Sequence, residues 1–147
     1  MEELCIAIMQ RWDSDAGGQA KEYIPAGLWF QEAPQQVLDS GQTYCVFFLM
    51  TGVTSYTFGT TIENPMVQFS IYATSEESSE SVGPVYMARD AFVRVYDQIL
   101  LSMQPDADGN TRRMIEMRRE GHGEVVKDPD EGYACHLMYS CKYTFER

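Results

Sequence analysis

The apolar pattern of the chain changes its period once, and this change most limits how the chain can fold. Residues Met66–Ala73 alternate between apolar and more polar positions, as a strand with one buried face does. The next apolar stripe recurs at steps of three and four residues, as on one face of a helix roughly 27 Å long. Its members are Val85, Ala88, Phe92, Val95, Ile99 and Met103. The sequence therefore predicts a sheet packed against one long amphipathic helix, with Phe92 and Val95 facing Phe69 and Ile71.

Four further segments have strand patterns. Tyr44–Met50 is apolar at every position, which predicts a strand buried on both faces. Tyr133–Glu146 alternates most clearly, and with the weakly alternating Thr111–Glu120 it predicts a hairpin whose connection, Gly121–Gly132, is long enough to project. Val53–Ile62 is rich in Thr, Ser, Tyr and Phe, a composition typical of an exposed β-arm or an edge strand.

The segment before these strands predicts smaller elements. Glu3–Trp12 has the spacing of a short helix, Leu28–Gln31 that of a short strand, and Val37-Leu38 that of a helical turn. With 147 residues, the chain is long enough for one domain, 1–147. We therefore expect an α+β fold: a mostly antiparallel sheet packed against one long amphipathic helix, plus a short N-terminal helix and a projecting β-arm or hairpin.

Composition limits the classes of function. The net charge is −11, so the phosphate backbone of a nucleic acid is repelled, although DNA can pass such a surface without binding. No apolar run is long enough to span a membrane, and the acidic start, Met1-Glu-Glu-Leu, is unlike a signal peptide. The cysteines lie inside apolar patterns with no C-x-x-C pair, and we expect four reduced structural thiols in a cytoplasm: Cys5, Cys45, Cys135 and Cys141.

No motif predicts chemistry. The chain has no nucleophile elbow, phosphate-binding loop, dinucleotide fingerprint or zinc-protease motif. The acidic turn around Asp108 differs from a calcium loop, because its glycine stands fourth instead of sixth. His136 points away from Cys135 and Cys141 if the strand alternates, and His122 lies between two glycines in a connection. We therefore expect no catalytic residue, no metal and no cofactor.

Aromatic residues outside the strand cores are the candidates for binding. Tyr56 and Phe58 lie in the Thr-rich arm, and Trp29 and Phe30 lie in a segment broken by Pro and Gly. One interpretation is local packing under loops; the other is an interface, because aromatics dominate the buried centres of contacts between chains. His122, in the connection expected to project, is the fifth candidate for an interface with a neighbouring subunit or a tube.

The order of these elements resembles that of a known family. The buried strand Tyr44–Met50, the Thr/Tyr arm, the strand Val67–Ala73, the helix around Ala88–Tyr96 and the final hairpin entered at Glu131-Gly-Tyr133 are similar to the small tail-completion, or tail-terminator, proteins of long-tailed bacteriophages. The resemblance covers most of the chain from Tyr44 onward. The chain departs from the family in its longer segment before Tyr44 and in its extended connections.

This resemblance implies a structural virion protein without enzymatic activity. It implies a homohexameric ring that caps the tail tube in the virion neck, stops tube polymerisation and joins the tail to the head–tail connector protein after assembly in the host cytoplasm. Six copies carry six times −11, or −66 charges, and a negative lumen lets DNA slide without specific binding. Two alternatives stay open: another phage neck, head–tail joining or tube subunit of similar fold, and a small cytoplasmic enzyme or ligand-binding domain.

Overall fold

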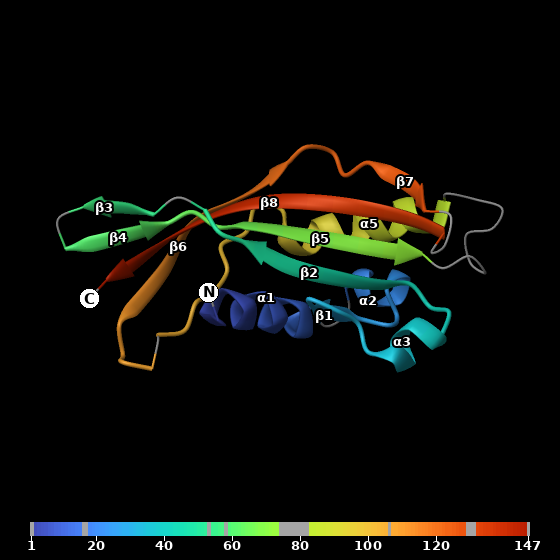
Figure 1. The fold of residues 1–147 in the computed structure, drawn as a ribbon, viewed down its shortest axis with the longest axis horizontal. Coiled ribbons are helices and arrows are strands. Elements are labelled where there is room, and N and C mark those ends of the chain that lie inside the picture. The colour runs from blue at the N-terminus through green and yellow to red at the C-terminus, as the bar shows by residue number, and fades with distance from the viewer. Residues whose placement is uncertain are drawn as a thin grey trace.

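The computed structural model describes residues 2–15, 18–52, 54–57, 59–73, 83–105, 107–128 and 132–146. These residues form a mixed α/β fold with a largely antiparallel sheet of eight strands and several helices (Figure 1). The elements are α1 (Glu2–Ser14), α2 (Ala20–Tyr23), β1 (Leu28–Phe30), α3 (Gln35–Asp39), β2 (Tyr44–Met50), β3 (Ser55–Thr57), β4 (Thr60–Glu63), β5 (Met66–Ala73), α5 (Gly83–Tyr96), β6 (Thr111–Glu120), β7 (Val125–Asp128) and β8 (Gly132–Glu146).

Strand β8 is the centre of the sheet. Along one of its edges it pairs with β5 and then with β4, and along the other with β7 and then with β6. Its 15 residues make these pairings possible, because each partner needs only part of its length. Beyond β5 lie β2 and then β1, which joins β2 in parallel; beyond β4 lies β3. The long alternating strand predicted from the sequence is therefore confirmed, and it organises the whole sheet.

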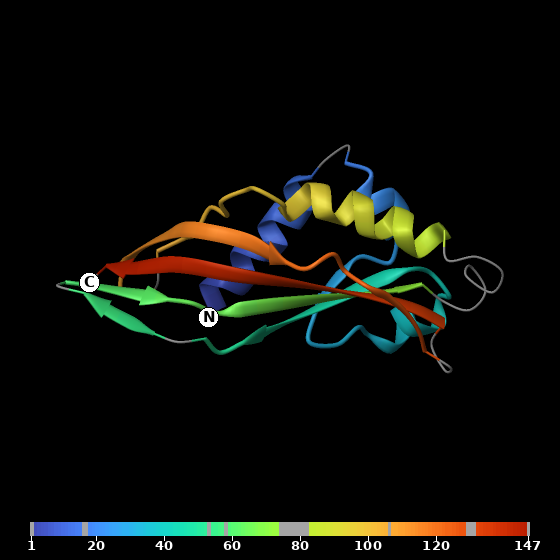
Figure 2. The same cartoon turned by 90° about the horizontal axis from the view of Figure 1, so that it is seen from above.

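Helices α1, α2 and α5 cover one face of the sheet (Figure 2). The apolar stripe of α5 meets the inward residues of β5 around Phe69, whose ring centroid lies 4.8 Å from that of Phe92 and 5.0 Å from that of Tyr96. Phe47 and Tyr139, from the neighbouring strands, complete this aromatic cluster at 5.7 and 5.6 Å from Phe69. All five side chains are fully buried. The predicted packing of the Phe92 stripe on the Phe69 strand is confirmed.

The single long helix is not confirmed. Helix α5 has 14 residues and ends at Tyr96, and α1 is nearly as long with 13. Gln98 adopts a left-handed backbone conformation with φ 57°, which a continuing helix excludes. The stripe misled the prediction because Ile99 and Met103 also fit a period of two. With the buried Leu101 between them, they alternate in burial with the exposed Leu100 and Ser102 in the segment after the helix.

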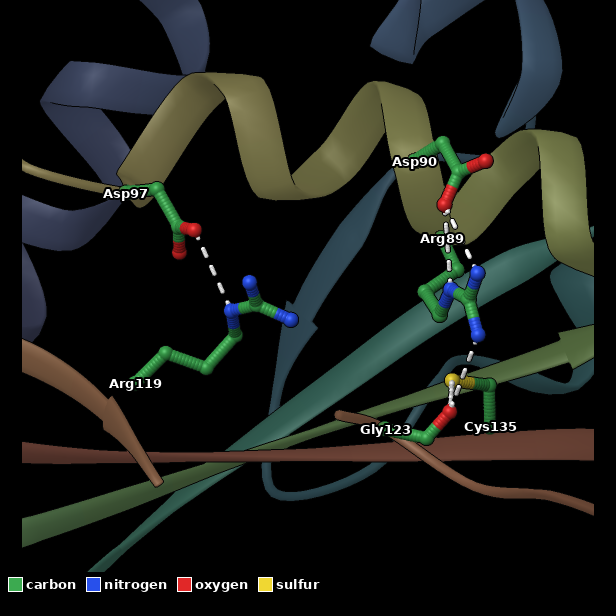
Figure 3. Close-up of polar contacts among 6 residues, drawn as sticks. All are labelled: Arg89, Asp90, Asp97, Arg119, Gly123 and Cys135. Carbon is green, nitrogen blue, oxygen red and sulfur yellow. Dashed lines mark hydrogen bonds and ion pairs between the residues drawn. The ribbon is translucent and has the colours of Figure 1, made fainter. Parts of the chain in front are cut away.

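Side chains from other elements hold the end of α5 in place. Arg11 of α1 donates from Nε to the carbonyl oxygen of Val95 at 3.0 Å, which satisfies one of the free acceptors of the last turn. The carboxylate of Asp97 accepts from Arg119 Nε of β6 at 3.1 Å (Figure 3) and from the Tyr139 hydroxyl of β8 at 2.6 Å. Burial and the adjacent Asp97 carboxylate raise the pKa of Tyr139, so its hydroxyl keeps the proton that it donates.

The prediction that the connection between β6 and β8 projects is wrong for its described part. Residues 125–128 form β7, which pairs with β8 and stays on the sheet. Before β7 the chain passes below α5, where the carbonyl oxygen of Gly123 accepts from Arg89 Nη1 at 3.4 Å and from Cys135 Sγ at 3.5 Å (Figure 3). The pairing of β6 with β8 itself is confirmed, with a bulge between Met114 and Glu116.

We expect the substitution Phe92→Ala to lower the free energy of unfolding by about 3–5 kcal/mol, because it opens a cavity in the aromatic cluster. For a domain of this size that corresponds to a fall in melting temperature of roughly 10 °C or more. Thermal unfolding followed by circular dichroism measures the change. A variant that melts within a few degrees of the parent would contradict the assigned role of Phe92.

Gly123 and Gly121 offer a matched pair for testing the passage below α5. Both have positive φ, 72° and 85°, so alanine at either costs about 1–2 kcal/mol of backbone strain. A Cβ at Gly123 would also press against Leu137, Arg89 and Cys135, whereas a Cβ at Gly121 would meet open space. Chemical denaturation should therefore show Gly123→Ala to be clearly less stable than Gly121→Ala. Equal losses would contradict the tight passage.

Candidate interaction surfaces

The β3–β4 hairpin extends from one end of the sheet, and its strand β3 is exposed along its whole length (Figure 1). All three residues of β3 are exposed, and the side chain of Tyr56 is 79% exposed. The residues of β4 are half-buried. The prediction of an exposed arm in this region is therefore confirmed.

The base of the hairpin is fixed, although its tip is exposed. Strand β4 pairs antiparallel with the last residues of β8, so the arm prolongs the central strand. At the base, Gly52 lies so close to the backbone of Asn64 that a Cβ at Gly52 would overlap its carbonyl group. Thr54 Oγ1 donates to Glu63 Oε2 at 2.9 Å across the same point. These contacts fix the direction in which the hairpin leaves the sheet. Tyr56 therefore has a defined position, and no loose loop has to become ordered when it binds a partner.

Trp29 and Phe30 do not form one patch, because they are neighbours on β1 and point to opposite faces of the sheet. Trp29 is half-buried and donates from Nε1 to the carbonyl oxygen of Ala26 at 2.8 Å. Phe30 is 43% exposed, and its ring lies 5.2 Å from that of Phe47. Both rings therefore have partners in their own chain, which fits the local-packing interpretation.

His122 is exposed at the passage between β6 and β7. It lines an open groove of about 390 Å³ together with Asp97, Gln98 and Arg119. This position is at the end of α5, away from the arm. The structure therefore does not bring the five predicted interface residues together: Tyr56 stands on the arm, Trp29 and Phe30 on an edge strand, His122 at the helix end, and Phe58 lies outside the described residues.

A second groove, which the sequence did not reveal, lies on the face of the sheet opposite to α5. Its volume is about 260 Å³, and its floor contains Tyr44 and Tyr72, whose rings stack at 5.2 Å between centroids. Leu38 of α3 forms one wall, and the further lining residues are Gln31, Glu32, Ala33, Val46, Phe48 and Ser70. The sequence signal for this groove was the apolar run of β2, which is apolar on both faces of the strand. We expected both faces to be buried and therefore did not predict a groove on one of them.

A polar pair adjoins the floor of this aromatic groove. Ser70 Oγ, buried, lies 2.8 Å from His136 Nδ1, and Gln68 Nε2 donates to the same oxygen at 3.2 Å. A nucleophilic serine needs a histidine that a third group orients. None of the described residues gives His136 a carboxylate partner. The arrangement satisfies a buried hydroxyl between two strands and does not amount to a catalytic triad.

The four cysteines are free thiols, and burial determines their chemistry. It raises the pKa of Cys135 to about 11 and that of Cys141 to about 12, and it raises the pKa of Cys45 and Cys5 as well. The thiolate is the reactive form, so burial lowers the reactivity of these groups near neutral pH, least for the half-buried Cys5. Within the described ranges, no group of three or more His, Cys, Asp or Glu is placed to hold a metal ion.

We expect thiol titration of the denatured protein, without reductant, to find four free groups. In the folded protein Cys5 should react first, because it is half-buried whereas the other three are buried. Neither a reductant nor a chelator should change the melting temperature. Fewer than four thiols, or a fall in melting temperature with chelator, would contradict the structural role of the cysteines.

Comparison with protein-family models and with curated protein sequences gives no relative from which a function can be transferred. No protein-family model matches the chain, and no curated protein sequence matches it. In the part of the chain that the structure describes, no helix is both long and apolar enough to cross a membrane. The surfaces described above are therefore the basis for a functional argument.

Proposed function

We propose that the protein is a ring-forming structural subunit of a bacteriophage tail: a tail terminator that caps the tail tube and joins it to the head–tail connector. The observation that carries the proposal is the arm, an anchored hairpin that presents a 79% exposed tyrosine away from the core of its own subunit. A monomer gains nothing from holding an aromatic side chain in water, whereas an interface gains from burying it.

The strength of such a contact suits an assembly made of repeated weak interfaces. Burying one aromatic side chain removes 150–250 Å² from water, worth several kcal/mol at about 25 cal/mol per Å². A closed ring repeats the same heterologous contact between every pair of neighbours, so a modest contact is sufficient. The contact joins subunits to one another or to the tail-tube protein. Because the hairpin is already ordered, little conformational freedom is lost on binding.

The charge supports a passage for DNA. Each chain carries −11, so a hexamer carries a large net negative charge that disfavours retention of the phosphate backbone. Such a ring lets DNA pass without specific binding. The same argument from charge applies to the alternative of another neck, head–tail joining or tube subunit. Neighbouring genes, or the position of the protein in an assembled tail, would distinguish such a subunit from a terminator.

The alternative of a small enzyme or ligand-binding domain has less support. The Ser70–His136 pair beside the aromatic groove lacks an orienting carboxylate among the described residues. That groove, at about 260 Å³, is also smaller than the roughly 300–1,000 Å³ of a usual ligand pocket, whereas the open groove beside His122, at about 390 Å³, lies within that range. Catalysis is therefore not part of the proposal.

We predict that replacing Tyr56 and Phe58 together by Ser leaves the fold intact and abolishes ring formation or tail attachment. Circular dichroism measures the fold, and size-exclusion chromatography with light scattering measures the assembly. Leu100→Ser is the matched control, because Leu100 is a 63% exposed apolar residue outside the arm. That control should assemble like the parent.

In a phage that depends on this chain, the double substitution should give filled heads and unjoined tails, with overlong tubes. Electron microscopy of lysates shows these particles directly. Normal particles from the double variant would remove the arm from the mechanism. A parent protein that stays monomeric at every concentration, also with the tail-tube protein present, would remove the ring.

A further inference from the structure

The open groove beside His122 brings together several polar side chains from the end of α5 and the end of β6. Its volume is about 390 Å³, which lies within the usual range for small-ligand sites. Its lining residues are Asp97, Gln98, Met117, Arg118, Arg119, Gly121 and His122. The lining is therefore mostly polar, and it contains more hydrogen-bond donors than the aromatic groove on the other face of the sheet.

Arg119 has a fixed position at this groove, and part of its guanidinium group is not used within the chain. Its Nε donates to Asp97 Oδ2 at 3.1 Å (Figure 3), and Asp97 Oδ1 accepts from the Tyr139 hydroxyl at 2.6 Å. Among the described residues, neither Nη1 nor Nη2 of Arg119 has a hydrogen-bond partner, and the side chain is 29% exposed. Asp97 therefore orients the guanidinium and leaves its two terminal donors for a ligand.

Gln98 and His122 add further donors to the same groove. Both residues are exposed, and neither side chain has a hydrogen bond to another described residue. The backbone of Gln98 has φ 57°, a conformation in which glycine is favoured and any longer side chain is strained. Glycine would end α5 without this strain. The amide of Gln98 is therefore a candidate for binding as well as for ending the helix.

We infer that this groove binds a carboxylate group. The terminal nitrogens of Arg119 donate to its two oxygens, and Gln98 and His122 are further donors at the same groove. A guanidinium group presents two parallel N–H bonds in one plane, and a carboxylate presents two acceptors at the matching spacing. The inference goes beyond the proposed function, because the binding of a carboxylate does not require a ring.

The charges around the groove favour an anion with one negative charge. Arg118 is neutralised by Glu116 and Glu120, at 3.9 and 2.9 Å, and Asp97 offsets the charge of Arg119. The groove therefore offers strong donors with little net positive charge. A phosphate dianion brings a second negative charge, which Asp97 and the net charge of −11 repel. A carboxylate forms the same pair of hydrogen bonds with less repulsion.

Two sources can supply this carboxylate: a small organic acid, or an Asp or Glu side chain of a partner protein. Both present the same two oxygens to Arg119, and the groove is open to the surface. The chemistry of the site is the same in the two cases. The probes of the experiment below distinguish them.

The test is a nuclear magnetic resonance titration of the isotope-labelled full-length protein with sodium acetate. The side-chain signals of Gln98, Arg119 and His122 should shift and then saturate. Acetamide has nearly the same shape without the charge, and it should cause no saturable shift; the same holds for sodium chloride at equal ionic strength. The peptide N-acetyl-Ala-Glu-Ala-amide, compared with its Gln counterpart, is the probe for a carboxylate of a partner protein. Tighter binding of the Glu peptide than of acetate assigns the site to a partner protein, and the reverse assigns it to a small acid.

Three variants test the named residues. Arg119→Lys keeps a positive charge beside Asp97 but loses the paired donors, so it should weaken acetate binding by about 10-fold or more. Gln98→Gly removes the amide and the backbone strain, so it should weaken binding while the melting temperature stays the same or rises. Arg113→Lys is the matched control, because Arg113 is an exposed arginine of the same strand that does not line the groove. That control should bind acetate like the parent.

Several results would overturn the inference. Shifts that acetamide or sodium chloride reproduces would show that no carboxylate is recognised, and unchanged affinity in Arg119→Lys would remove Arg119 from the site. Tighter binding of inorganic phosphate than of acetate at equal ionic strength would overturn the choice of a carboxylate. If Arg119→Lys does not fold by circular dichroism, unchanged affinity in Gln98→Gly decides against the site. Light scattering measures the ring separately, so either proposal can fail while the other stands.

Discussion

The packing of aromatic rings around Phe69 is the interaction on which the rest of the structure depends. Phe69 is on β5, and its ring meets Phe92 and Tyr96 of α5 as well as residues of the two neighbouring strands. Trp12 of α1 reaches the same cluster through Phe92 at 6.0 Å. Phe69 thus lies at the centre of a larger core in which buried residues of both long helices pack together with those of the sheet, among them Ile71 and Leu137. This core gives the apolar stripes of the helices their partners and covers one face of the sheet.

Because α1, α2 and α5 cover one face of the sheet, the two candidate surfaces formed by the arm and by the aromatic groove lie elsewhere. The arm extends along the direction of β8, and its base is held by the close approach of Gly52 to Asn64. The aromatic groove lies on the opposite face from α5, below α3. The fold therefore combines a packed core with one projecting hairpin and one aromatic groove. The proposed ring rests on the hairpin, whereas a site of chemistry needs converging reactive groups.

The polar contacts between α5 and the sheet serve the same rigidity. Asp97 accepts from Arg119, and Arg89 reaches the carbonyl oxygen of Gly123 (Figure 3). Asp97 also accepts from the hydroxyl of Tyr139. Each contact satisfies a group at the rim of the apolar layer, where water is only partly excluded. Together they fix the helix along its length, so the aromatic cluster keeps a single arrangement and the two ends of the subunit keep a fixed separation.

The sequence by itself determined the elements whose residues repeat with a clear period. The alternation of β5 and β8, the stripe of α5 as far as Val95 and the exposed composition of the arm all follow from local pattern, because burial of one face is written into every second or every third to fourth residue. Tertiary structure decided where α5 ends. Ile99 and Met103 fit both a helical period and a period of two, and the helix end is held by contacts with α1, β6 and β8. Tertiary structure also decided that β7 returns to the sheet and that Tyr44 and Tyr72 form a groove. These features depend on which segments meet in space, and no local pattern encodes that meeting.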